Sequence, residues 1–94
     1  PCLIRRAAFH KAGLADTTTY QTGTLAQAMA DADRRDDLAS VLRAVRRART
    51  ARIEPWVLHA GPLPDDPVER PRYVDVFRRG INELGNFLRA NGFP

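Results

Sequence analysis

The chain has 94 residues, of which 44% are apolar and 28% charged, a composition typical of one small globular domain or of a piece of a larger protein. Its formal net charge is +4, and no run approaches the ~18 consecutive apolar residues of a membrane span. The single cysteine, Cys2, excludes an internal disulfide framework and a zinc site built from cysteines.

The first segment, residues 1–23, is predicted to begin as a helix and to continue as extended polar chain. Helical spacing is followed by Leu3, Ile4, Ala7, Ala8 and Phe9. Gly13 is a suitable helix stop, and the three threonines at 17–19 favour extended chain over helix. Because the segment is too short for a core of its own, we expect it to have no partner inside the domain and to act as an N-terminal docking segment.

Residues 24–60 predict a pair of helices with a basic face. Thr24 and Gln27 have the spacing of a capping box in front of a short helix, LAQAMADA. Its predicted buried stripe consists of Leu25, Ala28 and Met29. For the next helix, Asp36 or Asp37 is the expected cap, because an acidic side chain suits a helix N-terminus.

The second helix of this pair has a predicted apolar face. Its members are Leu38, Val41, Leu42, Val45 and Ala48. Proline removes a backbone donor and clashes with the preceding turn, so Pro55 should end or kink this helix near Ile53.

The C-terminal part predicts a linker followed by the most regular helix of the chain. Residues 61–71 contain four prolines and indicate a stiff, extended connector. A final helix is predicted over 72–92, with Pro71 at its start and Gly92 at its end. Its apolar stripe is Val74, Phe77, Ile81, Leu84 and Leu88. The predicted fold class is therefore all-α, with three to four helices and extended, proline-rich connectors.

No motif in the sequence points to catalysis, a cofactor or a metal. His10 and His59 stand far apart, with no carboxylate or cysteine at ligand spacing. The adjacent Asp65 and Asp66 fall in the predicted linker, where their side chains need not converge. A glycine-rich phosphate loop, a nucleophile elbow and a CxxC pair are all absent. We therefore predict a non-enzyme without a cofactor.

The positive charge is concentrated in one segment. Residues 34–52 contain seven arginines and two aspartates, a net charge of +5, so the rest of the chain sums to −1. On the second predicted helix, Arg43, Arg46, Arg47 and Arg49 lie mostly off the apolar face. Three interpretations remain open: a solvated face, a nucleic-acid-binding face, and a face for acidic protein surfaces or anionic lipid head groups. The helix lacks the Asn and Gln side chains that read base edges.

Four short blocks occur in the order known from one family. The leading block, AAFHKAGLADTTTY, is followed by LAQAM, LRAVRRA and RPRYVDVF. The first has an Ala before Phe, a basic residue, Gly-Leu, and an Asp/Thr stretch that ends in Tyr20. Together they resemble the small matrix-side subunit of mitochondrial ubiquinol–cytochrome c reductase, the subunit 7 family of respiratory complex III.

This resemblance implies a non-catalytic structural subunit that is peripheral on the matrix side of the mitochondrial inner membrane. Its expected partners are cytochrome b and the neighbouring core subunits, with the arginine helix paired to their acidic residues or to cardiolipin-type head groups, and no nucleic acid. The partner-binding residues carried over are Phe9, Leu14, Tyr20, Arg43, Arg46, Arg47 and Tyr73. The alternatives are a small basic nucleic-acid-binding module and an accessory subunit of another organellar complex.

Overall fold

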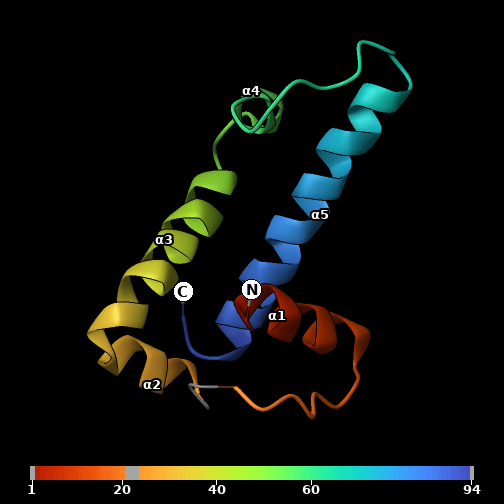
Figure 1. Ribbon diagram of the computed structural model, residues 1–94. Helices are drawn as coiled ribbons and strands as arrows, with labels where there is room; N and C mark the ends of the chain where they lie inside the picture. Colours follow the sequence, from red (N-terminus) through yellow and green to blue (C-terminus); the bar gives the residue numbers. More distant parts are fainter. Residues whose placement is uncertain (1, 21–23, 94) are drawn as a thin grey trace.

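A single long helix organises the molecule. The computed structural model describes residues 2–20 and 24–93, and in this part of the chain it contains five helices and no strand. The helices are α1 (Cys2–Ala12), α2 (Leu25–Ala30), α3 (Ala32–Ala48), α4 (Ile53–Leu58) and α5 (Glu69–Ala90). Helices α1, α3 and α4 pack against α5, and α2 packs against α3 (Figure 1). The all-α prediction is confirmed, but the expected three to four helices are five.

Helix α5 is bounded by two local signals. At its start, Oδ1 of Asp66 accepts hydrogen bonds from the backbone N–H groups of Val68 (2.7 Å) and Glu69 (3.0 Å), so the chain turns into the helix inside the predicted linker. At its end, Gly92 adopts a φ of 89° and the N–H of Phe93 donates to the carbonyl of Leu88 at 3.0 Å. This is a Schellman motif, so the predicted stop is confirmed.

The predicted stripe of α5 forms the centre of the core. Val74, Ile81 and Leu88 are buried, and Phe77 and Leu84 are half-buried. Helix α5 approaches α3 closely at Gly85. A Cβ added there would lie only 3.1 Å from Cγ1 of Val45. The buried cluster joins α2, α3 and α5 and consists of Leu25, Leu38, Val45, Ile81 and Leu88. This confirms the apolar faces predicted for these three helices.

The start of α2 was predicted correctly, and the start of α3 was not. The capping box is present: Gln27 N–H donates to Oγ1 of Thr24, and Thr24 N–H donates to Oε1 of Gln27, both at 3.1 Å. Helix α3, however, begins at Ala32 with Asp31 as its cap, and Oδ1 of Asp31 accepts from Asp33 N–H at 2.9 Å. Asp31 offers the same cap chemistry one turn earlier than Asp36 and Asp37, so the helix gains an extra turn.

The predicted break at Pro55 also needs correction. Helix α3 ends at Ala48, and a separate short helix, α4, contains Pro55 as its third residue. Proline is tolerated there because the first backbone N–H groups of a helix have no partner within the helix. The region 24–60 is therefore three helices rather than a pair.

The N-terminal segment has a partner inside the chain, which overturns the expectation that it has none. Helix α1 packs against α5, and Ala7 on its inner side is only 2% exposed. The ring of His10 meets Phe87 of α5 edge-on, with centroids 5.8 Å apart. Gly13 ends α1 with a φ of 69°, as predicted. Residues 1 and 21–23 of the predicted docking segment lie outside the described residues.

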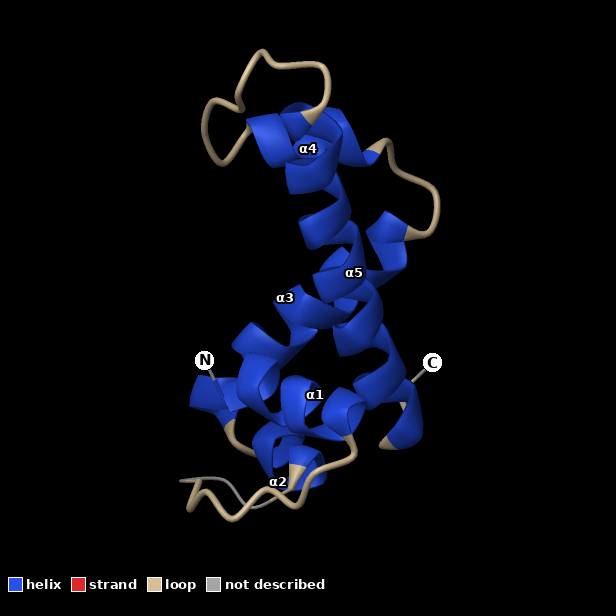
Figure 2. Ribbon diagram, turned by 90° about the vertical axis from the view of Figure 1, so that its right-hand side faces the viewer, coloured by secondary structure: helices blue, strands red, loops and turns tan. Residues whose placement is uncertain are grey.

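The described molecule is elongated, with extents of 43 × 28 × 21 Å. Figure 2 shows α4 and the neighbouring loops at one end and α1 and α2 at the other, with α3 and α5 running between them. The described part holds no helix with the length and apolar character that crossing a membrane requires.

Candidate partner-binding site

The predicted arginine face exists and is open to solvent. Arg43, Arg46, Arg47 and Arg49 are all exposed in the C-terminal half of α3 or directly after it. The opposite side of this helix carries buried Leu38 and Val45. Positive charge near a helix C-terminus is favourable for the helix dipole. The segment therefore folds stably while presenting its charge outward.

These arginines lack acidic partners in the described part of the chain. No carboxylate there lies within ion-pair distance of Arg43, Arg46 or Arg47, whereas Arg79 pairs with Asp75 at 3.0 Å. Among the described residues, Nη2 of Arg43 donates only to the hydroxyl of Ser40, at 3.1 Å. A guanidinium presents five N–H donors, so most of the donors on this face are left for water or for another molecule.

Arg47 differs from its neighbours because it is engaged within the chain. Its guanidinium carbon lies 4.7 Å from the centroid of the Trp56 ring, which is a cation–π contact between α3 and α4. Trp56 in turn meets Phe77 of α5 edge-on, at 5.2 Å and 68°. This stack of Arg47, Trp56 and Phe77 connects α3, α4 and α5. Sequence reasoning missed this stack, although Trp56 follows Arg49, the last residue of the arginine face, after only seven positions.

A second group of predicted residues lies at residues 14–20, directly after α1. This segment folds back on α1 and is called the hook. The guanidinium carbon of Arg6 lies 3.9 Å from the centroid of the Tyr20 ring. The Tyr20 hydroxyl donates to Oδ2 of Asp16, and the Thr18 N–H donates to Oδ1 of Asp16 at 3.0 Å. These contacts fold the segment after Gly13 back toward α1.

Hydrogen bonding and burial in the hook shift the pKa values of Asp16 and Tyr20 in opposite directions. The hydrogen bond from Tyr20 holds the pKa of Asp16 below its ordinary value, and the Thr18 N–H adds to the effect. Burial of the ring raises the pKa of Tyr20, and its hydrogen bond to Asp16 adds to that shift. The folded hook therefore favours an ionised Asp16 beside a neutral Tyr20.

The structure brings three predicted residues together around one hollow of about 480 Å³. Phe9, Leu14 and Tyr20 line it, along with Phe87 of α5. Phe9 and Tyr20 are half-buried, so part of each ring is already covered within the chain, whereas Leu14 is 66% exposed. Of these three residues, Leu14 is thus the one whose side chain is most open to another molecule.

Tyr73 stands apart from both groups. It lies near the start of α5 and is 54% exposed. Val76, one turn later, is 59% exposed. The seven predicted residues therefore occupy three places: the hook, the arginine face and the outer side of α5.

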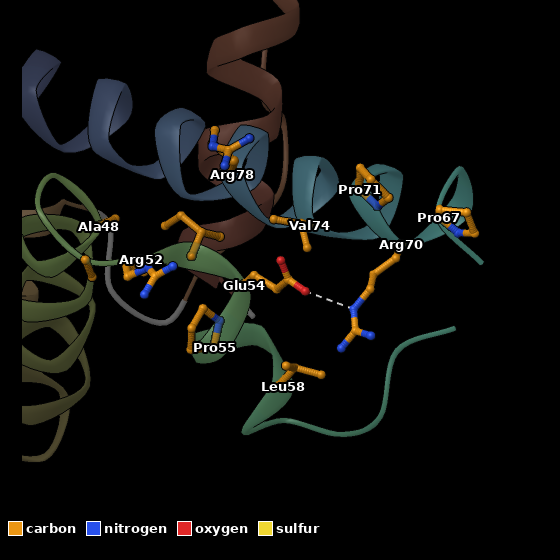
Figure 3. A pocket seen from close by; sticks show the side chains of 12 residues that line it. Ala48, Arg52, Glu54, Pro55, Leu58, Pro67, Arg70, Pro71, Val74 and Arg78 are labelled. Carbon is orange, nitrogen blue, oxygen red and sulfur yellow. Dashed lines mark ion pairs between the residues drawn. The ribbon is translucent and has the colours of Figure 1, made fainter. Parts of the chain in front are cut away.

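A hollow of about 880 Å³ between α4 and the start of α5 was not predicted. Figure 3 shows Arg70 reaching from α5 across it to Glu54 of α4, with Val74 pointing inward. Nε of Arg70 lies 2.9 Å from Oε1 of Glu54, and Nη1 lies 3.7 Å from Oδ1 of Asp65. Through these ion pairs, Arg70 connects α5 to α4 and to the loop that precedes α5. The arrangement is suited to fixing the short helix rather than to chemistry.

No group of three or more His, Cys, Asp or Glu side chains in the described part could hold a metal ion. What the geometry offers is a set of outward arginine donors and scattered exposed apolar side chains, which suits binding.

Comparisons with protein-family models, curated proteins and solved structures gave no match to this chain. The resemblance to the complex III subunit therefore rests on the four short sequence blocks and their order.

Proposed function

We propose that the chain is a non-catalytic structural subunit of mitochondrial ubiquinol–cytochrome c reductase, held on the matrix side of cytochrome b. The observation that carries this proposal is the exposed arginine face of α3, which lacks acidic partners in the described part of the chain. Such a face fits a partner that supplies the carboxylates. The identity of that partner comes from the order of the four sequence blocks.

Arginine is the residue suited to such a contact. Its planar guanidinium binds a carboxylate through two parallel hydrogen bonds, which lysine cannot reproduce. Arg43 and Arg46 lie one turn apart on α3, so they can reach neighbouring acids on one partner surface. Anionic head groups of cardiolipin type at the inner membrane would meet the same donors.

The exposed apolar residues supply the second element of the proposed interface. Leu14 at the hook and Tyr73 on α5 are 66% and 54% exposed. Aromatic and large aliphatic side chains contribute most to binding when a partner removes them from water. We expect both to be covered in the assembly, whereas Phe9 and Tyr20 contribute mainly by shaping the hook.

The direct test is isolation of the tagged chain from detergent-solubilised mitochondria of its source cells, followed by an absorption spectrum of the co-isolated material. The proposal expects b-type and c-type heme in the isolate, with the same tag on an unrelated matrix protein as the control. An isolate with other proteins but no heme would assign the chain to a different assembly. Recovery of nucleic acid instead would favour a phosphate-binding role for the same arginines.

A further inference from the structure

The arginines on the exposed face of α3 are not equivalent, because one of them is held in place by other helices. The guanidinium carbon of Arg47 lies 4.7 Å from the centroid of the Trp56 ring. That ring meets Phe77 of α5 edge-on, with centroids 5.2 Å apart. Among the described residues, no ring makes such a contact with Arg43 or Arg46. Of these three arginines, Arg47 is therefore the one whose charged group is positioned by α4 and α5.

The contact with Trp56 positions Arg47 without using its hydrogen-bonding capacity. A guanidinium carries five N–H donors, and the face of an aromatic ring supplies no oxygen acceptor for them. Among the described residues, no hydrogen bond or ion pair occupies the side-chain donors of Arg47. Arg47 is exposed, and Trp56 is half-buried. The guanidinium of Arg47 is thus held in place while its donors remain open to another molecule.

Holding a side chain in advance raises its contribution to binding. A mobile arginine loses rotamer freedom when a partner immobilises it, whereas a side chain that is already held loses less. Arg43 is tied only to the exposed hydroxyl of Ser40 on its own helix, and that hydrogen bond takes up one of its donors. Arg46 makes no side-chain hydrogen bond or ion pair with the described residues. Arg47 should therefore contribute more to binding than Arg43 or Arg46.

We propose that Arg47 is the anchor of the arginine face and that Trp56 is its positioning residue. Arg47 binds a carboxylate of an acidic protein surface through paired hydrogen bonds, and Trp56 holds the guanidinium from the side away from that carboxylate. This inference rests on the proposed function for the class of partner, and it ranks the arginines of the same face. It also makes Trp56, which need not touch the partner, a determinant of affinity.

The test is the binding of fluorescein-labelled hexaglutamate to the chain, followed by fluorescence anisotropy at low salt. Arg47→Lys keeps the charge but loses the paired hydrogen bonds, so it should weaken binding more than Arg43→Lys does. Trp56→Leu leaves both arginines in place and should weaken binding roughly three- to tenfold, the range expected for one side chain that must be immobilised on binding. Trp56→Tyr should keep most of the wild-type affinity, because tyrosine also offers a ring face to a cation.

A double-mutant cycle separates positioning from damage to the fold. The loss caused by Arg47→Lys should be smaller in the Trp56→Leu background than in the wild type, whereas the loss caused by Arg43→Lys should be the same in both. Circular dichroism verifies that each variant keeps its helical content. An equal change of both losses in the Trp56→Leu background would indicate damage to the fold and would contradict the positioning role.

Two further results would overturn the proposal: hexaglutamate binding that Trp56→Leu does not change, and a loss for Arg43→Lys as large as that for Arg47→Lys. A hexanucleotide that binds more tightly than hexaglutamate would overturn the carboxylate as the ligand. The heme test of the proposed function is independent of these outcomes. Heme in the isolate together with unchanged binding by Trp56→Leu would refute the anchor alone, whereas Trp56-dependent binding without heme would refute the assembly and keep the anchor.

Discussion

The rest of the chain covers the apolar face of α3 and leaves its arginine face exposed. The apolar face is covered by α2 and α5, with Leu38 only 1% exposed. On the other face, Arg43 and Arg46 form no ion pair with any of the residues that the structure describes. Burial of apolar surface is the dominant favourable term in folding, and exposed charges contribute little to it. The apolar face therefore supplies stability, and the arginine face is the one that we propose to bind a partner.

The largest expected effect comes from emptying the covered face. Leu38→Ala should lower the free energy of unfolding by about 3–5 kcal/mol, because it leaves a cavity in a fully buried site. Urea titration followed by circular dichroism measures this value. Arg35→Ala, an exposed change on the same helix, is the control and should stay within about 0.5 kcal/mol. A loss below about 1 kcal/mol for Leu38→Ala would mean that this face is not the stabilising one.

A smaller effect separates the two glycines inside α5. A Cβ at Gly80 meets nothing within 4 Å, so Gly80→Ala should stabilise the protein by about 0.5–1 kcal/mol through helix propensity. At Gly85 the added Cβ would lie 3.1 Å from Cγ1 of Val45, on the covered face of α3. Gly85→Ala should therefore gain less than Gly80→Ala or destabilise the protein. Equal stabilisation by both changes, measured by thermal unfolding, would contradict the close approach of α3 and α5.

The hook predicts a local dependence on pH. Because the pKa of Asp16 is lowered in the fold, its contribution to the hook is present above the ordinary carboxyl value of about 3.9 and is lost as the pH falls below it. Because the pKa of Tyr20 is raised, its contribution is present below about pH 10 and is lost as the pH rises through the folded value. The protection factor of the Thr18 amide, its exchange rate relative to that of an unstructured peptide at the same pH, should therefore be largest between these limits.

Tyr20→Phe provides the control for this prediction. It removes the hydroxyl that donates to Asp16 and keeps the ring beneath Arg6. In this variant the protection factor of the Thr18 amide should no longer fall at high pH, and its fall at low pH should be smaller than in the wild type. An unchanged profile would show that the hydroxyl does not hold the hook.

Local patterns were sufficient to predict much of the fold. The stripe of α5, the capping box of α2 and the glycine stops of α1 and α5 depend on residues within a few positions of one another, so they could be predicted from the sequence. The start of α3 could not be chosen, because Asp31, Asp36 and Asp37 have the same cap chemistry. The packing of α1 on α5 joins segments far apart in the chain and has no local signal.

In the candidate site, too, the features set by neighbouring residues could be predicted, and those that depend on the packing of distant elements could not. The exposure of Arg43 and Arg46 follows from the helical period of α3 and was predicted. The contact of Arg47 with Trp56 depends on where α4 lies. A helix break was predicted at Pro55 in place of α4, so this contact was not predicted. Arg47 therefore contributes both to the arginine face and to the contact between α3 and α4.

The most direct test of the division between the two faces compares folding with retention for Arg43→Lys/Arg46→Lys. Arg47 is left unchanged because of its contact with Trp56, and Arg78→Lys/Arg79→Lys on α5 is the matched control. We predict that both variants unfold within about 0.5 kcal/mol of the wild type. We also predict that only the α3 variant is lost from the heme-containing complex during detergent isolation, because lysine cannot form the paired hydrogen bonds. Full retention of the α3 variant, together with wild-type binding to DNA that falls steeply with salt, would contradict the account.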